Sequence, residues 1–195
     1  GDKHRHIIYL ATVVKNPEQR KRLIDLLDRT IVHPDVLTQA QMRCVEREQD
    51  GGNLFLFPKS ESPELSDPVQ WAADYVVCSW MGRGGHSGKR TEFTQSIAIR
   101  YTSGGGDSCT RFRSFVKSID AWGDAFLNWC FACIECWEFM DRCVDNPKHG
   151  LYVDAPWPGP GDEYKFNFKR PDQVRLRDTL EAFKEMRIVV RFNDH

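Results

Sequence analysis

Apolar residues recur at intervals of three and four in the first half of the chain, which is the spacing of amphipathic helices. A polar residue followed by proline stands at or near the start of each such stretch, a combination typical of helix N-termini. We therefore expect helices over residues 18–30, 34–49 and 68–81. The run at 6–14, HIIYLATVV, fits either a strand or the start of an apolar helix.

Short apolar runs alternate with helical spacing in the last third of the chain. We expect helices over residues 114–129, 137–145 and 170–186, and strands over residues 130–136, 150–154 and 187–192. The last two strands are continuous apolar runs, the kind found in sheets that are buried on both faces. Strands that alternate with helices predict an α/β fold with a parallel sheet and right-handed crossovers.

Composition narrows the class of protein. A length of 195 residues suits one domain, and the formal charge of −1 excludes a basic field over the whole chain. The charge is uneven, however, because seven basic and only two acidic residues occupy the glycine-rich stretch from Arg83 to Lys117. No apolar run is long enough to span a membrane, and no export signal is evident. We therefore interpret the seven cysteines as reduced thiols and expect a cytoplasmic protein.

A carboxylate stands where one predicted strand ends: Asp154 precedes Pro156 and Trp157. Taken alone, Asp154 is equally compatible with capping a turn and with binding a ligand at the carboxyl end of a parallel strand. Its neighbours favour ligand binding. The carboxylate and a nearby backbone carbonyl can accept both hydrogens of an exocyclic amine, and the indole can stack on a flipped base.

The segment YVDAPW resembles the D-P-P-Y motif of DNA adenine-specific methyltransferases of the Dam-like class. Over about residues 71–192, further segments before and after this motif are similar to the family and stand in the expected order. Among them are WAADYVVCSWMGRGG and DQVRLRDTLEAFKEMRIVVRF. The resemblance implies a partial Rossmann-like, S-adenosylmethionine-dependent methyltransferase sheet with a helical and glycine-rich recognition segment. It also implies methyl transfer to the amino group of adenine in double-stranded DNA, without a metal, in a bacterial or phage-type restriction-modification setting.

Carried over by position, the resemblance assigns roles to individual residues. Asp154 would bind the target amine, Pro156 would supply the backbone acceptor, and Trp157 would stack on the base. Tyr164 and Phe166 would line the base pocket. The cofactor-binding residues would be Asp2, Cys136, Trp137 and Asp154. The DNA-binding residues would be Arg83, Lys89, Arg90, Arg100, Arg111 and Arg113. Residues 1–30 would be a remnant of the cofactor region, residues 31–120 the recognition segment, and residues 121–195 the catalytic part.

The sequence departs from the family at four places. Ala155 replaces the usual second-position proline, and Trp157 replaces the tyrosine of the motif. No glycine-rich turn precedes Asp2, and the sequence stops at His195, where the family continues with further strands. We therefore expect an incomplete sheet that forms a homodimer or is completed by another chain. One alternative is a DNA-binding remnant without catalysis. A second is an iron–sulfur protein, based on the spacing of Cys130, Cys133, Cys136 and Cys143. No histidine pattern indicates zinc.

Overall fold

The computed structural model describes residues 4–49, 67–82, 88–98, 107–156 and 160–191. They belong to two units. The helical unit is Gly1–Ser87 with Thr91–Cys133, and the sheet unit is Gly88–Arg90 with Ile134–His195. The described helices of the helical unit are α1 (Arg5–Lys15), α2 (Pro17–Arg29), α3 (Pro34–Gln49), α5 (Pro68–Met81) and α6 (Ser108–Ala125).

Side-chain caps start the helices of the helical unit where the sequence places them. Asn16 accepts hydrogen bonds from the backbone N–H groups of Glu18 and Gln19, and Pro17 occupies the first turn of α2. Asp67 caps α5 in the same way. The predicted helices at 18–30, 34–49 and 68–81 are therefore confirmed. The ambiguous run at 6–14 belongs to α1.

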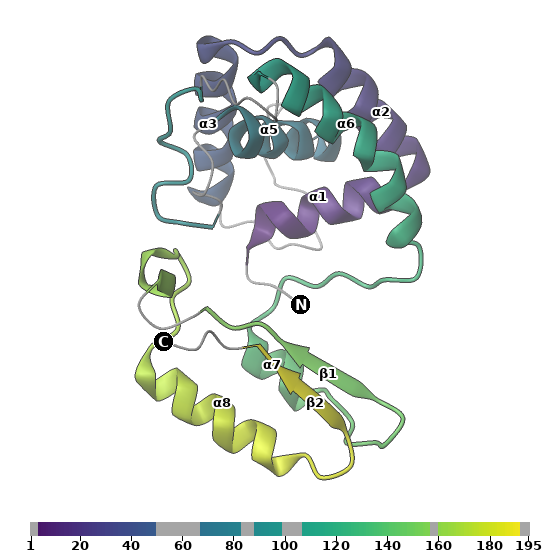
Figure 1. The fold of residues 1–195 in the computed structure, drawn as a ribbon, viewed down its shortest axis with the longest axis vertical. Helices are drawn as coiled ribbons and strands as arrows, with labels where there is room; N and C mark the ends of the chain where they lie inside the picture. Colours follow the sequence, from purple (N-terminus) through teal and green to yellow (C-terminus); the bar gives the residue numbers. More distant parts are fainter. Residues whose placement is uncertain (1–3, 50–66, 83–87, 99–106, 157–159, 192–195) are drawn as a thin grey trace. The chain divides into compact units, whose positions relative to one another are not determined.

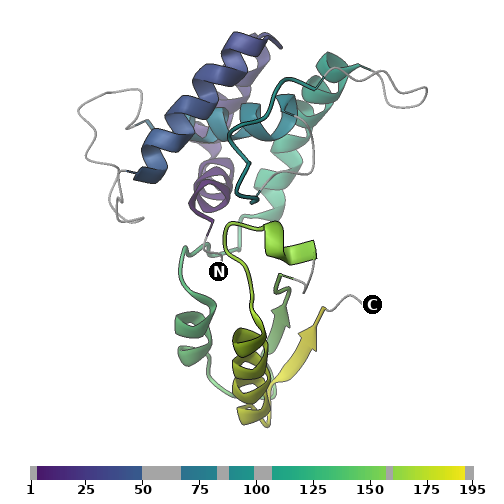
Figure 2. The ribbon, with the colours of Figure 1, turned by 90° about the vertical axis from the view of Figure 1, so that its left-hand side faces the viewer.

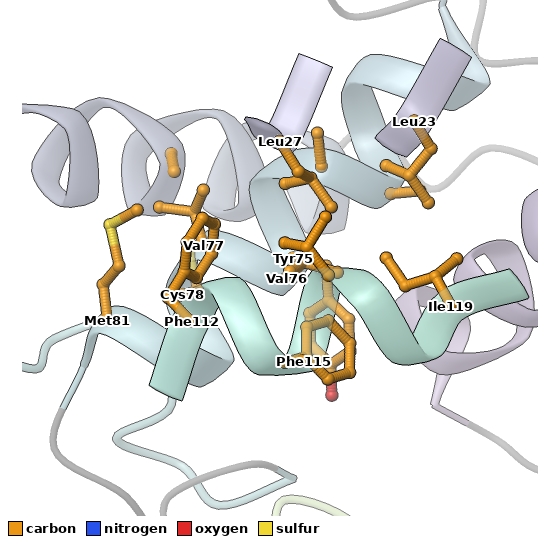
Figure 3. Close-up of a cluster of buried hydrophobic side chains, with 14 of the residues drawn as sticks. Leu23, Leu27, Tyr75, Val76, Val77, Cys78, Met81, Phe112, Phe115 and Ile119 are labelled. Carbon is orange, nitrogen blue, oxygen red and sulfur yellow. The ribbon is translucent and has the colours of Figure 1, made fainter. Parts of the chain in front are cut away.

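Helix α5 forms the centre of the helical unit and is buried along most of its length. Helices α1, α2, α3 and α6 surround it (Figure 1). Leu23 and Leu27 of α2 and Ile119 of α6 are fully buried in the same core, which Figure 3 shows in close-up. Burial of these apolar side chains is the main force that holds the five helices together.

A buried ion-pair network joins α3 to α5. The carboxylate of Asp74 accepts two hydrogen bonds from Arg43, at 2.9 and 2.7 Å, one from Arg47 at 2.7 Å, and one from Gln70 at 2.9 Å. The side chains of Asp74 and Arg47 are almost fully buried. Because burial of an unpaired charge is costly, these contacts fix the register of the two helices.

The sheet unit holds α7 (Cys136–Asp141), β1 (Gly150–Val153), the 3₁₀ turn η1 (Pro160–Glu163), α8 (Arg170–Ala182) and β2 (Arg187–Val190). Strands β1 and β2 are parallel, with Leu151 opposite Ile188 and Tyr152 opposite Val189. Helix α8 connects the strands and lies along one face of the pair in both views (Figures 1 and 2). The unit is therefore an α/β arrangement, and within the described residues its sheet has two strands.

Two predictions about strands are wrong. Residues 130–136 do not form a strand: the chain is irregular apart from an isolated bridge at Cys133, and Cys136 already begins α7. Strands β1 and β2 are also not buried on both faces, because Tyr152 is 61% exposed and Val189 is 59% exposed. Their side chains alternate between exposed and half-buried, since α8 covers one face only.

Candidate catalytic site

Asp154 directly follows β1, and Arg191 directly follows β2. The backbone N–H of Arg191 donates to the carbonyl of Val153 at 2.9 Å, which continues the ladder by one step. The Arg191 Nη1 atom lies 3.4 Å from Asp154 Oδ2. The parallel register thus places a cation beside the predicted catalytic acid. Arg191 was not predicted as a site residue, because the strand was predicted over residues 187–192 and so included it. A basic residue near the carboxyl end of a predicted parallel strand was an available signal.

Gly161 lies very close to Pro156. A Cβ atom at Gly161 would come within 3.1 Å of both the carbonyl carbon and the Cβ of Pro156. Gly161 is buried within η1, so the turn folds back onto the segment that follows Asp154. The close approach explains why a residue without a side chain stands at position 161. Trp157, the predicted stacking residue, lies outside the described residues.

Tyr164 is brought next to two of the predicted DNA-binding residues. Lys89 and Tyr164 form an isolated antiparallel bridge, and the backbone N–H of Arg90 donates to the carbonyl of Glu163 at 3.3 Å. The Lys89 ammonium group also pairs with the Glu163 carboxylate. Tyr164 and Phe166 are both more than one-third exposed. One residue of the predicted base pocket and two basic residues from the glycine-rich stretch therefore lie side by side in the sheet unit.

Trp137, predicted to contact the cofactor, sits in an aromatic cluster. The guanidinium carbon of Arg175 lies 4.3 Å from the centre of the Trp137 ring, and the ring of Phe168 stacks at 6.0 Å. Partial desolvation and the neighbouring Glu135 carboxylate raise the pKa of the Cys136 thiol. Cys136 is therefore a neutral thiol at pH 7. Asp2, the other predicted cofactor residue, lies outside the described residues.

The remaining predicted DNA-binding residues differ in their surroundings. Arg113 donates to the carbonyl oxygens of Leu27 at 2.8 Å and Thr30 at 2.9 Å, so its guanidinium group caps the C-terminus of α2. Arg111, two residues earlier along α6, is exposed. Arg83 and Arg100 lie outside the described residues. DNA contact by these four arginines stays a prediction.

The chain matches no protein-family model, and no curated protein is significantly similar to it. Within the described ranges, no three histidine, cysteine or acidic side chains lie close enough together to hold a metal ion. Among the described residues, the four cysteines proposed as cluster ligands form no disulfide bonds. No described helix combines the length and apolar character needed to cross a membrane.

Proposed function

We propose that this chain is an S-adenosylmethionine-dependent methyltransferase that modifies the exocyclic amino group of adenine in double-stranded DNA. The observation that carries the proposal is the position of Asp154 at the carboxyl end of β1, beside the parallel strand β2. Open parallel sheets bind their ligands at this end. The β1–α8–β2 unit supports a Rossmann-like sheet, and the resemblance of YVDAPW to the D-P-P-Y motif supports the reaction.

Asp154 would prepare the amine for attack. The carboxylate would accept one N–H of the amino group, and a backbone carbonyl near Pro156 would accept the other. The nitrogen lone pair then leaves conjugation with the ring, and the positive charge that develops during methyl transfer is stabilised. Arg191 lies against Oδ2, and Asp154 Oδ1 has no hydrogen-bond partner among the described residues. We therefore assign Oδ1 to the substrate amine.

The cofactor would supply the methyl group from its sulfonium centre. Trp137, which has Arg175 4.3 Å from its ring centre and Phe168 stacked at 6.0 Å, is the aromatic side chain that would stack on the adenine ring of the cofactor. The basic residues Lys89 and Arg90 lie next to Tyr164, which supports an approach of the DNA backbone to the base pocket.

A second candidate is a DNA-binding protein of the same fold without catalysis. The exposed face of the sheet favours it, because Tyr152 and Val189 would be covered in a complete parallel sheet. The same exposure supports a homodimer, or a second chain, that covers this face.

Calorimetric titration of S-adenosylmethionine into the chain, alone and with adenine-containing duplex DNA, tests the proposal. A methylation assay then measures N6-methyladenine in the digested DNA by mass spectrometry. We expect cofactor binding, and we expect Asp154→Ala to reduce methyl transfer by about a hundredfold or more. Asp162→Ala is the matched control, since Asp162 is an exposed acid in η1. Binding of DNA without any cofactor binding would favour the second candidate.

A further inference from the structure

Two histidines are buried at the start of helix α1. His4 is 5% exposed and His6 is 1% exposed, although both side chains are polar. His6 stacks on Tyr75 of α5 at 5.4 Å and meets the edge of Phe93 at 5.1 Å. The N-terminus of α1 is therefore attached to the rest of the helical unit through imidazole rings.

The hydrogen bond from Trp71 determines the protonation state of His6. The indole Nε1–H of Trp71 donates to His6 Nδ1 at 2.6 Å, so Nδ1 carries no proton and the ring is neutral. The proton of His6 therefore resides on Nε2. This atom is buried without a hydrogen-bond partner among the described residues, and it lies 3.6 Å from Glu48 Oε1.

His4 is held in the same tautomer. Its Nδ1 atom accepts from the backbone N–H of Ile7 at 3.4 Å and so caps α1. Its Nε2–H then donates to Glu92 Oε2 at 2.9 Å. In both rings the Nδ1 atom is an acceptor that faces an N–H donor.

We propose that His6 forms a pH-sensitive lock that releases helix α1 on mild acidification. A proton added to His6 Nδ1 turns the acceptor into a donor that points at the indole N–H of Trp71, and the bond is lost. Release of α1 would also separate Tyr9 from Trp71, whose rings stack at 3.9 Å.

Some of the charges around His6 raise its pKa and others lower it. The carboxylates of Glu48 and Glu92 favour the protonated ring, whereas His4 disfavours it. Two further groups face this region: Arg47 of α3 lies over Trp71 at 5.3 Å, and Asp74 of α5 is paired with Arg47. Desolvation is the largest effect, and the pKa of His6 lies below its ordinary value. The stabilisation of helix α1 by neutral His6 is therefore complete above about pH 6.5 and is lost as the pH falls below that value. The equilibrium constant that favours the closed helix decreases by about tenfold between pH 7.5 and 5.5.

Native-state hydrogen exchange of the full chain at these two pH values tests the lock. After correction for intrinsic exchange, we expect the protection of α1 amides to fall about tenfold relative to α6 amides in the unmodified protein. His6→Asn keeps an acceptor near the position of Nδ1 but does not titrate, so its α1 protection should not change with pH. His33→Asn is the matched control, because His33 is half exposed and should leave the pH response intact.

The lock is refuted if α1 protection does not depend on pH, or if His6→Asn shows the same fall as the unmodified protein. Nitrogen NMR of the unmodified protein gives a second measurement that does not depend on a variant folding. We expect His6 to show the neutral tautomer with its proton on Nε2 at pH 7.5. A positively charged His6 in the folded protein at pH 6.5 would overturn the proposal.

Discussion

Arg191 Nη1 lies 3.4 Å from Asp154 Oδ2, and the two residues follow the last residues of two parallel strands. The two residues are thirty-seven positions apart in the sequence. The backbone bond from Arg191 to Val153 keeps them at the same end of the sheet. Under the proposed function, Arg191 orients Asp154 so that its other oxygen faces the target amine.

Replacement of Arg191 should therefore have a smaller effect than replacement of Asp154. Both side chains are about half exposed, and an exposed ion pair contributes at most about 1 kcal/mol. We expect Arg191→Met to lower the rate of methyl transfer by no more than about fivefold, with the cofactor affinity unchanged. Arg177→Met, which removes an exposed arginine of α8, is the control. A loss with Arg191→Met as large as that with Asp154→Ala would mean that Arg191 contacts the substrate itself.

The buried network around Asp74 should dominate the stability of the α3–α5 contact. Asp74→Ala would remove the carboxylate that pairs with the buried Arg47 guanidinium, at a cost of about 3–5 kcal/mol in the free energy of unfolding. Asp120→Ala removes an ion pair with Arg20 in which the acid is mostly exposed, and it should cost less than about 1 kcal/mol. Urea denaturation of the two variants measures the difference. Equal effects would show that the Asp74 network is not energetically distinct from a surface pair.

Gly161 should be intolerant of larger side chains because of Pro156. A Cβ atom 3.1 Å from two atoms of the proline would force the loop after Asp154 to move. We expect Gly161→Val to reduce methyl transfer more than it reduces thermal stability, since the contact positions the loop rather than the core. Gly150→Ala, whose Cβ would meet only the carbonyl oxygen of Arg187 at 3.8 Å, is the control. A similar loss of activity in both variants would argue against a specific role of the Pro156 contact.

Asp145 should make the turn before β2 sensitive to strong acid. Its carboxylate accepts from the backbone N–H groups of Lys184, Glu185 and Met186, at 2.7, 3.0 and 2.7 Å. These bonds lower the pKa of Asp145. The stabilisation that these bonds give is therefore complete above the unfolded-state pKa of about 3.9. It is lost as the pH falls through the lower folded-state pKa of Asp145.

We expect Asp145→Ala to speed hydrogen exchange at residues 184–186 at neutral pH. The unmodified protein should approach the behaviour of the variant only below about pH 4. Asp178→Ala, which removes an exposed acid of α8, should leave these amides protected. Protection at residues 184–186 that is the same in Asp145→Ala and in the unmodified protein would show that the three bonds do not hold the turn.

Local signals in the sequence were sufficient for most of the helices. Asn16 before Pro17 and Asp67 before Pro68 are caps that act within one turn, so their effect is visible without the rest of the protein. The prediction of where α6 starts was less accurate. The helix begins at Ser108, after the Asp107 cap, rather than near residue 114. The cap falls in a glycine-rich stretch whose composition obscured it.

Long-range contacts account for what the sequence did not predict. The apolar run at 130–136 has the composition of a strand, but a strand needs a ladder of hydrogen bonds to a neighbour. Within the described residues this segment shows an isolated bridge at Cys133 in place of such a ladder. In the same way, the exposure of Tyr152 and Val189 depends on how many layers cover the sheet, which an apolar run does not encode. The burial of His4 and His6 equally depends on α3 and α5 packing over them.

The sequence by itself determined the caps, the helical periodicity, the apolar segments that form the two strands and the acid at the end of the first, because each depends on neighbours a few residues away. Only the tertiary structure decided that Arg191 lies beside Asp154, that Gly161 supports Pro156 and that Lys89 pairs with Tyr164. The physical reason is that these contacts join segments that are distant along the chain. They form only when the strands align in register and the turns close, which no local preference specifies.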